Sequence, residues 1–116
     1  MFVFSTNTIG VQSNGEQTNT TTATVLADTG ALTPNGGRFV VWVTFATDAN
    51  AQFDIQRRNA ANAANVGSVP TVYVPANDTR QFSFAFALGA GERIRVVPNA
   101  GITGVCAVTL NYQRVS

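Results

Sequence analysis

A chain of 116 residues fits a single domain, and its formal net charge of +1 provides no strong field to attract nucleic acid or an anionic membrane. Charged residues make up only 11% of the sequence and hydrophobic residues 45%, so much of the surface must be uncharged. Histidine is absent, which excludes the commonest general base and the commonest metal ligand.

The N-terminal part of the chain, residues 1–22, is expected to form an arm ahead of a β-sandwich domain at residues 23–116. Phe2, Val3 and Phe4 begin it, and polar residues that tolerate an extended backbone follow. Such a backbone needs hydrogen-bond partners, either the edge of the domain's own sheet or a neighbouring subunit, and a loosely ordered terminus is the alternative. The segment does not resemble a secretory signal, and no stretch is apolar for long enough to cross a bilayer.

The longest predicted strand covers residues 38–47 and follows a short strand at 24–27. Side chains alternate between the two faces of a strand. One face of 38–47 carries Phe39, Val41, Val43 and Phe45, and the other carries Val40, Trp42, Thr44 and Ala46. Both faces are mainly apolar, which is typical of a strand covered on two sides. In a two-layer sandwich, a loop, the arm or another subunit must then cover one face.

Further strands are predicted at 51–58, 69–74, 81–88 and 92–97, and a last one contains Cys106, Val108, Leu110 and Tyr112 on one face. Pro70 and Pro75 favour an edge position for the strand at 69–74. Phe82, Phe84 and Phe86 share a face with Leu88, which predicts a ladder of rings that supplies the core. About seven or eight short strands predict an all-β fold, an antiparallel β-sandwich or jelly roll.

The residues that could carry catalysis are few. Asp48 and Asp54 lie on two arms of one predicted hairpin, so a pair of the glycosidase kind is conceivable, but turn chemistry is the favoured interpretation. A calcium site from Asp48, Asn50 and Asp54 lacks the ligand density of a dedicated loop. Cys106 lies in an apolar run, where a small buried hydrophobe is expected. We therefore expect no enzyme activity, no catalytic residue, no cofactor and no metal.

The residues that could carry binding are aromatic side chains and arginines. All seven basic residues are arginines, and arginine is enriched at protein interfaces whereas lysine is depleted. Trp42 or Tyr73 could stack on a sugar ring, although a buried core position is the favoured interpretation of Trp42. Arg57, Arg58, Arg93 and Arg95 could form a basic patch, but the low net charge disfavours nucleic acid.

Three segments, residues 53–62, 73–80 and 90–96, resemble a group of small β-sandwich proteins encoded among the structural genes of tailed bacteriophages. The similarity extends over roughly residues 23–112. It implies a jelly-roll decoration, or cement, protein that is made in the host cytoplasm and resides in the virion, on the capsid surface. It implies a homotrimer that binds the major capsid protein, and it transfers no catalytic residue.

Three hypotheses follow. The leading one is a decoration protein that binds the assembled phage head and stabilises it by bridging capsid subunits. Its candidate subunit or capsid contacts are Phe2, Phe4, Ile9, Val11, Trp42, Arg57 and Arg58. The second is a carbohydrate- or receptor-binding module of a phage tail or baseplate, which would use Trp42 or Tyr73. The third is a small enzyme that uses Asp48 and Asp54.

Overall fold

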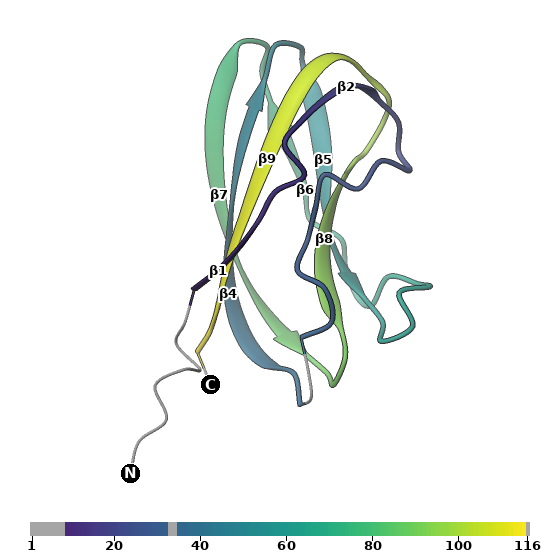
Figure 1. The fold of residues 1–116 in the computed structure, drawn as a ribbon, viewed down its shortest axis with the longest axis vertical. Helices are drawn as coiled ribbons and strands as arrows, with labels where there is room; N and C mark the ends of the chain where they lie inside the picture. Colours follow the sequence, from purple (N-terminus) through teal and green to yellow (C-terminus); the bar gives the residue numbers. More distant parts are fainter. Residues whose placement is uncertain (1–8, 33–34, 116) are drawn as a thin grey trace.

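The computed structural model describes residues 9–32 and 35–115, and these form strands, turns and loops without a helix (Figure 1). The strands are β1 (Ile9–Gln12), β2 (Glu16–Thr20), β3 (Ala27–Asp28), β4 (Gly37–Thr47), β5 (Ala51–Arg58), β6 (Thr71–Val74), β7 (Asp78–Leu88), β8 (Arg93–Pro98) and β9 (Ile102–Arg114). The described part of the chain therefore contains no helix that could span a membrane.

The strands form two antiparallel sheets that pack face to face (Figure 1). Sheet A has the order β1-β9-β4-β7, with β2 also paired to β9, and sheet B has the order β3-β8-β5-β6. The chain changes sheet at every connection except those from β1 to β2 and from β5 to β6. This arrangement is a jelly roll, so the predicted all-β sandwich is confirmed.

The core lies between the sheets and is built from alternate residues of the long central strands. Phe39, Val41, Val43 and Phe45 of β4 are buried, as the alternation predicts. The rings of Phe45 and Phe53, which come from opposite sheets, lie 4.5 Å apart between centroids. Burial of one such ring stabilises the fold by about 2–3 kcal/mol relative to an exposed ring. On β9, Cys106, Val108 and Leu110 are buried on the same inner face, which confirms the predicted alternation and the buried cysteine.

Residues 9–20 of the expected N-terminal arm lie in sheet A as β1 and β2. Both strands pair with β9: Ile9 lies opposite Gln113, and Glu16 lies opposite Ala107. Of the partners considered for this backbone, the structure shows the edge of the domain's own sheet. Phe2 and Phe4, the first two candidate contacts, lie outside the described residues.

The strand predicted at 24–27 is wrong in its extent. Its ladder is limited to Ala27 and Asp28, which pair with Val96 and Arg95 of β8. Upstream, the Leu26 amide still donates to the Val96 carbonyl of β8 at 2.8 Å, but the Leu26 carbonyl accepts from the amide of Asn14, in the loop between β1 and β2. The backbone of Leu26 is thus shared between β8 and this loop.

The aromatic ladder of β7 is on one face, as predicted, but it contributes less to the core than we expected. Phe82, Phe84 and Phe86 are only half-buried and pack against the margin of the core. The reason is the position of β7, which is an edge strand of sheet A. The opposite edge strand, β6, has 4 residues against 11 in β7, so it cannot cover the whole ladder. The edge position predicted for the strand around β6 is confirmed.

Candidate functional site

The outer face of sheet B presents polar and aromatic side chains along three adjacent strands. Alternation that buries Phe53 and Ile55 of β5 turns the intervening residues outward. The strand register then sets them in rows across β6, β5 and β8. The side chains of this face are Thr71 and Tyr73 of β6, Gln52, Asp54, Gln56 and Arg58 of β5, and Arg93 and Arg95 of β8.

Tyr73 lies at one end of this face, beside a shallow hollow. Its side chain is 48% exposed, and Gln52 lies directly opposite it in the β5–β6 register. The hollow has a volume of about 250 Å³, and its lining includes Tyr73, Gln52, Asn50 and the segment Ala100–Gly101. The residues of that segment are small. An aromatic ring beside side-chain amide groups is an arrangement that can bind a flat, hydroxylated ring.

The middle of the face is held by a hydrogen-bond network around Asp54. Its carboxylate accepts from the Thr71 hydroxyl at 2.6 Å and from the Asn99 side-chain amide at 3.1 Å. The Asn99 backbone amide in turn donates to the Gln52 carbonyl at 2.9 Å. These bonds join the loop after β8 to β5, and they fix one wall of the hollow beside Tyr73.

The other end of the face carries arginines. Gln56 lies opposite Arg95, and its Oε1 accepts from Nε of Arg95 at 2.6 Å. Arg58 lies opposite Arg93, and Arg93 pairs with Asp28 at 3.2 Å. Burial, followed by the positive charge of Arg58, lowers the pKa of the Arg95 guanidinium.

Arg57 and Glu92 form a separate ion pair at the end of β5. The shortest distance, from Nη2 of Arg57 to Oε1 of Glu92, is 2.7 Å, and the same oxygen accepts from the Gly89 amide at 2.6 Å. Burial acts to raise the pKa of Glu92, but the bonds from Gly89 and Arg57 outweigh it and hold that pKa below its ordinary value. This pair ties the β7–β8 turn to β5.

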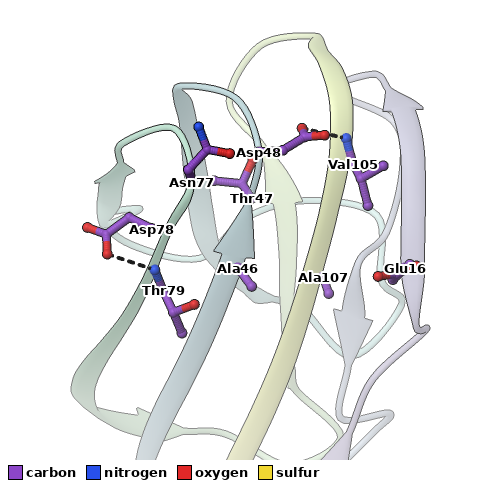
Figure 2. Close-up of a pocket in the computed structure, with 9 residues that line it drawn as sticks. All are labelled: Glu16, Ala46, Thr47, Asp48, Asn77, Asp78, Thr79, Val105 and Ala107. Carbon is purple, nitrogen blue, oxygen red and sulfur yellow. Dashed lines mark hydrogen bonds between the residues drawn. The ribbon is translucent and has the colours of Figure 1, made fainter.

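The carboxylates that could have supported catalysis or a metal are hydrogen-bonded to other groups of the chain. Figure 2 shows Asp48 and Asp78 beside a second hollow, each bonded to a backbone amide. Asp48 accepts from the Val105 amide at 2.8 Å, and Asp78 accepts from the Thr79 amide at 2.8 Å. The hairpin predicted to hold Asp48 and Asp54 is wrong, because β4 and β5 lie in different sheets. Asp54 instead accepts hydrogen bonds from Thr71 and Asn99. Residues 9–32 and 35–115 contain no group of three or more acidic or cysteine side chains placed to hold a metal ion.

The predicted contact residues fall on opposite sides of the sandwich. Ile9 and Val11 are 50% and 58% exposed on β1, and they lie on the outer face of sheet A. Trp42 is on this face too, because Asn111 of β9 lies opposite both Trp42 and Val11. It is half-buried, so the expectation of a core tryptophan is wrong. Arg57 and Arg58, by contrast, are in β5 of sheet B.

The outer face of sheet A is the more apolar of the two outer faces. Val115, which is 52% exposed, joins Val40 and Ala85 in lining a hollow of about 380 Å³. Val40 and Trp42 remain half-buried, so this side of β4 has less cover than its sequence led us to expect.

The sequence indicates only some of the residues on and beside the sheet B face. It marks Tyr73 and Arg95 as binding candidates, but it does not mark Gln52, Gln56 or Gly101. The hairpin between β5 and β6 offers one signal, since it brings Gln52 beside Tyr73. The contribution of Gly101 depends on a loop far along the chain, and the sequence contains no local signal for it.

Comparison with models of protein families finds no match, and comparison with curated proteins finds none either. Solved structures do match. The chain is similar to the globular domain of zebrafish complement 1qA protein, with a TM-score of 0.59 and 8% identity over 93% of this chain and 95% of that chain. The CBM22-1 and GH10 modules of Clostridium thermocellum xylanase 10B, complexed with xylohexaose, match with a TM-score of 0.62 and 9% identity over 93% of this chain and 25% of that chain.

A third similar structure is the enzymatically active domain of tailspike protein 4 from bacteriophage CBA120. Its TM-score is 0.54 at 12% identity, over 92% of this chain and 19% of that chain. At such identities the similarity shows the jelly-roll fold alone.

Proposed function

We propose that this chain is a non-catalytic carbohydrate-binding domain of a phage tail or baseplate, and that it binds a glycan on the outer face of sheet B. The observation that carries the proposal is the side chain of Tyr73, which is 48% exposed beside the hollow lined by Gln52 and Asn50. A buried sugar needs an apolar surface for one ring face and hydrogen bonds for its hydroxyl groups. Tyr73 supplies the first, and the amides supply the second.

The geometry of the hollow supports this assignment. Oδ1 of the Asn50 side chain accepts a hydrogen bond from the Ala76 backbone amide at 2.9 Å, which fixes this side chain. The NH2 group of the same side chain can then donate to a ligand. Gln52 is exposed, and the described contacts leave its side-chain amide available. A side chain that is held in place, as Asn50 is, loses little conformational entropy when it binds a ligand.

The similar structures support the proposal through their fold. Part of a xylanase complexed with xylohexaose and part of a phage tailspike domain share the fold of this chain, over 25% and 19% of their own lengths. A jelly roll accommodates many functions, so the proposal depends on the Tyr73 surface and not on the fold.

The test is a glycan array with the purified chain, followed by affinity measurements on the variants Tyr73→Ala and Tyr73→Phe. Loss of the ring should weaken binding roughly tenfold or more, while Tyr73→Phe should keep most of the affinity. Trp42→Ala is the matched control, because Trp42 lies on the outer face of sheet A. An array without hits, or equal losses for Tyr73→Ala and Trp42→Ala, would contradict the proposal.

A second candidate function is decoration of a phage head, and one observation favours it. Ile9, Val11 and Val115 are about half exposed on the outer face of sheet A, where Trp42 also lies. Exposed apolar residues gathered on one face are typical of protein interfaces. In this alternative, the face would bind the major capsid protein, and homotrimers would bridge capsid subunits.

Cosedimentation with assembled heads tests this alternative. Val11→Asp should abolish binding to heads if the sheet A face is the contact, while Tyr73→Ala should leave it unchanged. A chain that is monomeric in solution and does not sediment with heads would exclude decoration.

A further inference from the structure

The arginine end of the sheet B face holds more positive charge than its own acids neutralise. Arg58 lies directly opposite Arg93, and Arg95 follows Arg93 on the same face of β8. Like charges directly opposite each other destabilise a sheet. Among the described residues, the acid that the register places at this end is Asp28, which lies opposite Arg95 and pairs with Arg93 at 3.2 Å.

All three nitrogens of the Arg58 guanidinium bond to the loop that follows β5. Its Nε donates to Asn62 Oδ1 at 3.1 Å, its Nη2 to the Asn62 carbonyl at 3.0 Å, and its Nη1 to Asn65 Oδ1 at 2.9 Å. The role of Arg58 is therefore to position this loop, although its charge still acts on its neighbours.

Arg95 and Arg93, by contrast, have guanidinium N–H groups without a partner among the described residues. Only Nε of Arg95 has a partner within the described part of the chain, and that partner is Gln56. Nε of Arg93 is buried without any partner there. This buried Nε is out of reach of solvent, but the Arg93 side chain is 23% exposed, so its other N–H groups can meet a ligand.

We propose that Arg93 and Arg95 bind an anionic group, a carboxylate or a sulfate, of an acidic polysaccharide that lies along β5. This inference rests on the proposed carbohydrate-binding function and specifies its ligand class. A guanidinium presents paired N–H donors in a plane, which matches two oxygens of such a group.

The spacing along β5 fits an extended polymer. Gln52 beside Tyr73 and Gln56 beside Arg95 are four residues apart on one strand, a distance of about 13 Å. A polymer with one sugar ring on Tyr73 can thus reach Arg95 with a later ring. Asp54 lies between them and would repel a second carboxylate, so the acidic group belongs over Arg95.

The experiment compares a polyuronate and a sulfated polysaccharide with their neutral counterparts, the carboxyl-reduced and desulfated polymers. Affinities are measured for the wild-type chain and for Arg95→Gln, Tyr73→Ala and Arg80→Gln. The last is the matched control, because Arg80 is an arginine of sheet A that pairs with Asp78. Thermal unfolding of each variant verifies that it is folded.

The wild type should bind at least one acidic polymer about tenfold or more tightly than its neutral form, since a charge-assisted pair is lost in the latter. Arg95→Gln should remove this preference, and Arg80→Gln should retain it. Tyr73→Ala should weaken both forms. The acidic polymer that is bound, uronate or sulfate, identifies the source of the anionic group.

The possible negative results distinguish failure of this inference from failure of the proposed carbohydrate-binding function. Equal binding of the acidic and neutral forms, or a preference that survives Arg95→Gln, overturns the inference and leaves the proposed function standing. Absence of binding to every polymer overturns both. Binding of single-stranded DNA that Arg95→Gln abolishes, without binding of any polysaccharide, overturns both in favour of nucleic acid.

Discussion

Asp48 and Glu92 show that single acidic residues in this chain stabilise its own backbone. The Asp48 carboxylate accepts a hydrogen bond from the amide of Val105, and the Glu92 carboxylate accepts from the amide of Gly89 and from Arg57. Glu92 bonds the backbone of its own turn, as acids near turns normally do, whereas Asp48 bonds a strand far along the chain. They are therefore structural positions, and changes there should affect stability and not binding.

Asp48→Ala should lower the free energy of unfolding by about 1 kcal/mol, because the Val105 amide loses its acceptor. Asp48→Asn retains a side-chain oxygen and should lose less. Equilibrium unfolding in urea measures both changes. A neutral effect of Asp48→Ala would show that water replaces the carboxylate without cost.

Glu92 should make stability depend on pH. Its pKa is lower in the folded chain than the ordinary value of 4.5, so the carboxylate stabilises the fold fully above that pH. The contribution is lost as the pH falls through the lower, folded pKa. The difference in melting temperature between wild type and Glu92→Gln should therefore be constant near neutral pH and shrink in acid. A difference that grows in acid would contradict this sign.

At the scale of elements, the position of a strand in its sheet decides how much its side chains contribute. Phe45 is on β4, which has a partner strand on either side, and it is fully buried. Phe84 is on the edge strand β7 and is half-buried. The two residues have the same side chain in a similar alternating pattern.

Phe45→Ala should cost about 3–5 kcal/mol of unfolding free energy, because a buried ring is replaced by a cavity. Phe84→Ala should cost about half as much or less, since part of the ring already contacts water. Chemical denaturation of the two variants measures the contrast. Equal losses would mean that the β7 ladder belongs to the core, as its sequence pattern alone suggested.

Alternation within strands was predictable, while contacts between distant strands were not. Phe39 to Phe45 and Cys106 to Leu110 revealed their inner faces because side-chain direction depends only on the local backbone. The half-burial of Phe84 depends on the length of β6 in the other sheet. Likewise, Tyr73 was evident as an aromatic candidate, but the pairing of Gln56 with Arg95 follows from the β5–β8 register, which turn lengths do not determine.

At the scale of the whole molecule, the two outer faces differ in chemistry. Sheet A presents exposed apolar residues such as Val11 and Val115, and sheet B presents Tyr73 with amides and arginines. One face therefore suits contact with protein and the other suits a polar ligand. Between the two faces lies the core, to which β9, an inner strand of sheet A, contributes the buried Cys106.

Cys106 should report the opening of the whole sandwich. It is fully buried between β2 and β4, and burial raises the pKa of its thiol, so reaction in the folded state should be very slow. Labelling with a thiol reagent should accelerate in urea in parallel with unfolding, and Cys106→Ser measures the background. Rapid labelling in native buffer would show that sheet A opens locally.

The pairing of β1 and β2 with β9 also has a consequence for the order of folding. The first described strands join one of the last, so sheet A lacks its centre until Ile102–Arg114 is present. On the ribosome, residues 9–20 must wait unpaired while most of the remaining chain is synthesised. Such distant pairings slow folding and leave strand edges exposed meanwhile. Residues 9–20 contain few apolar side chains. We therefore expect this unpaired segment to resist aggregation until β9 has been synthesised.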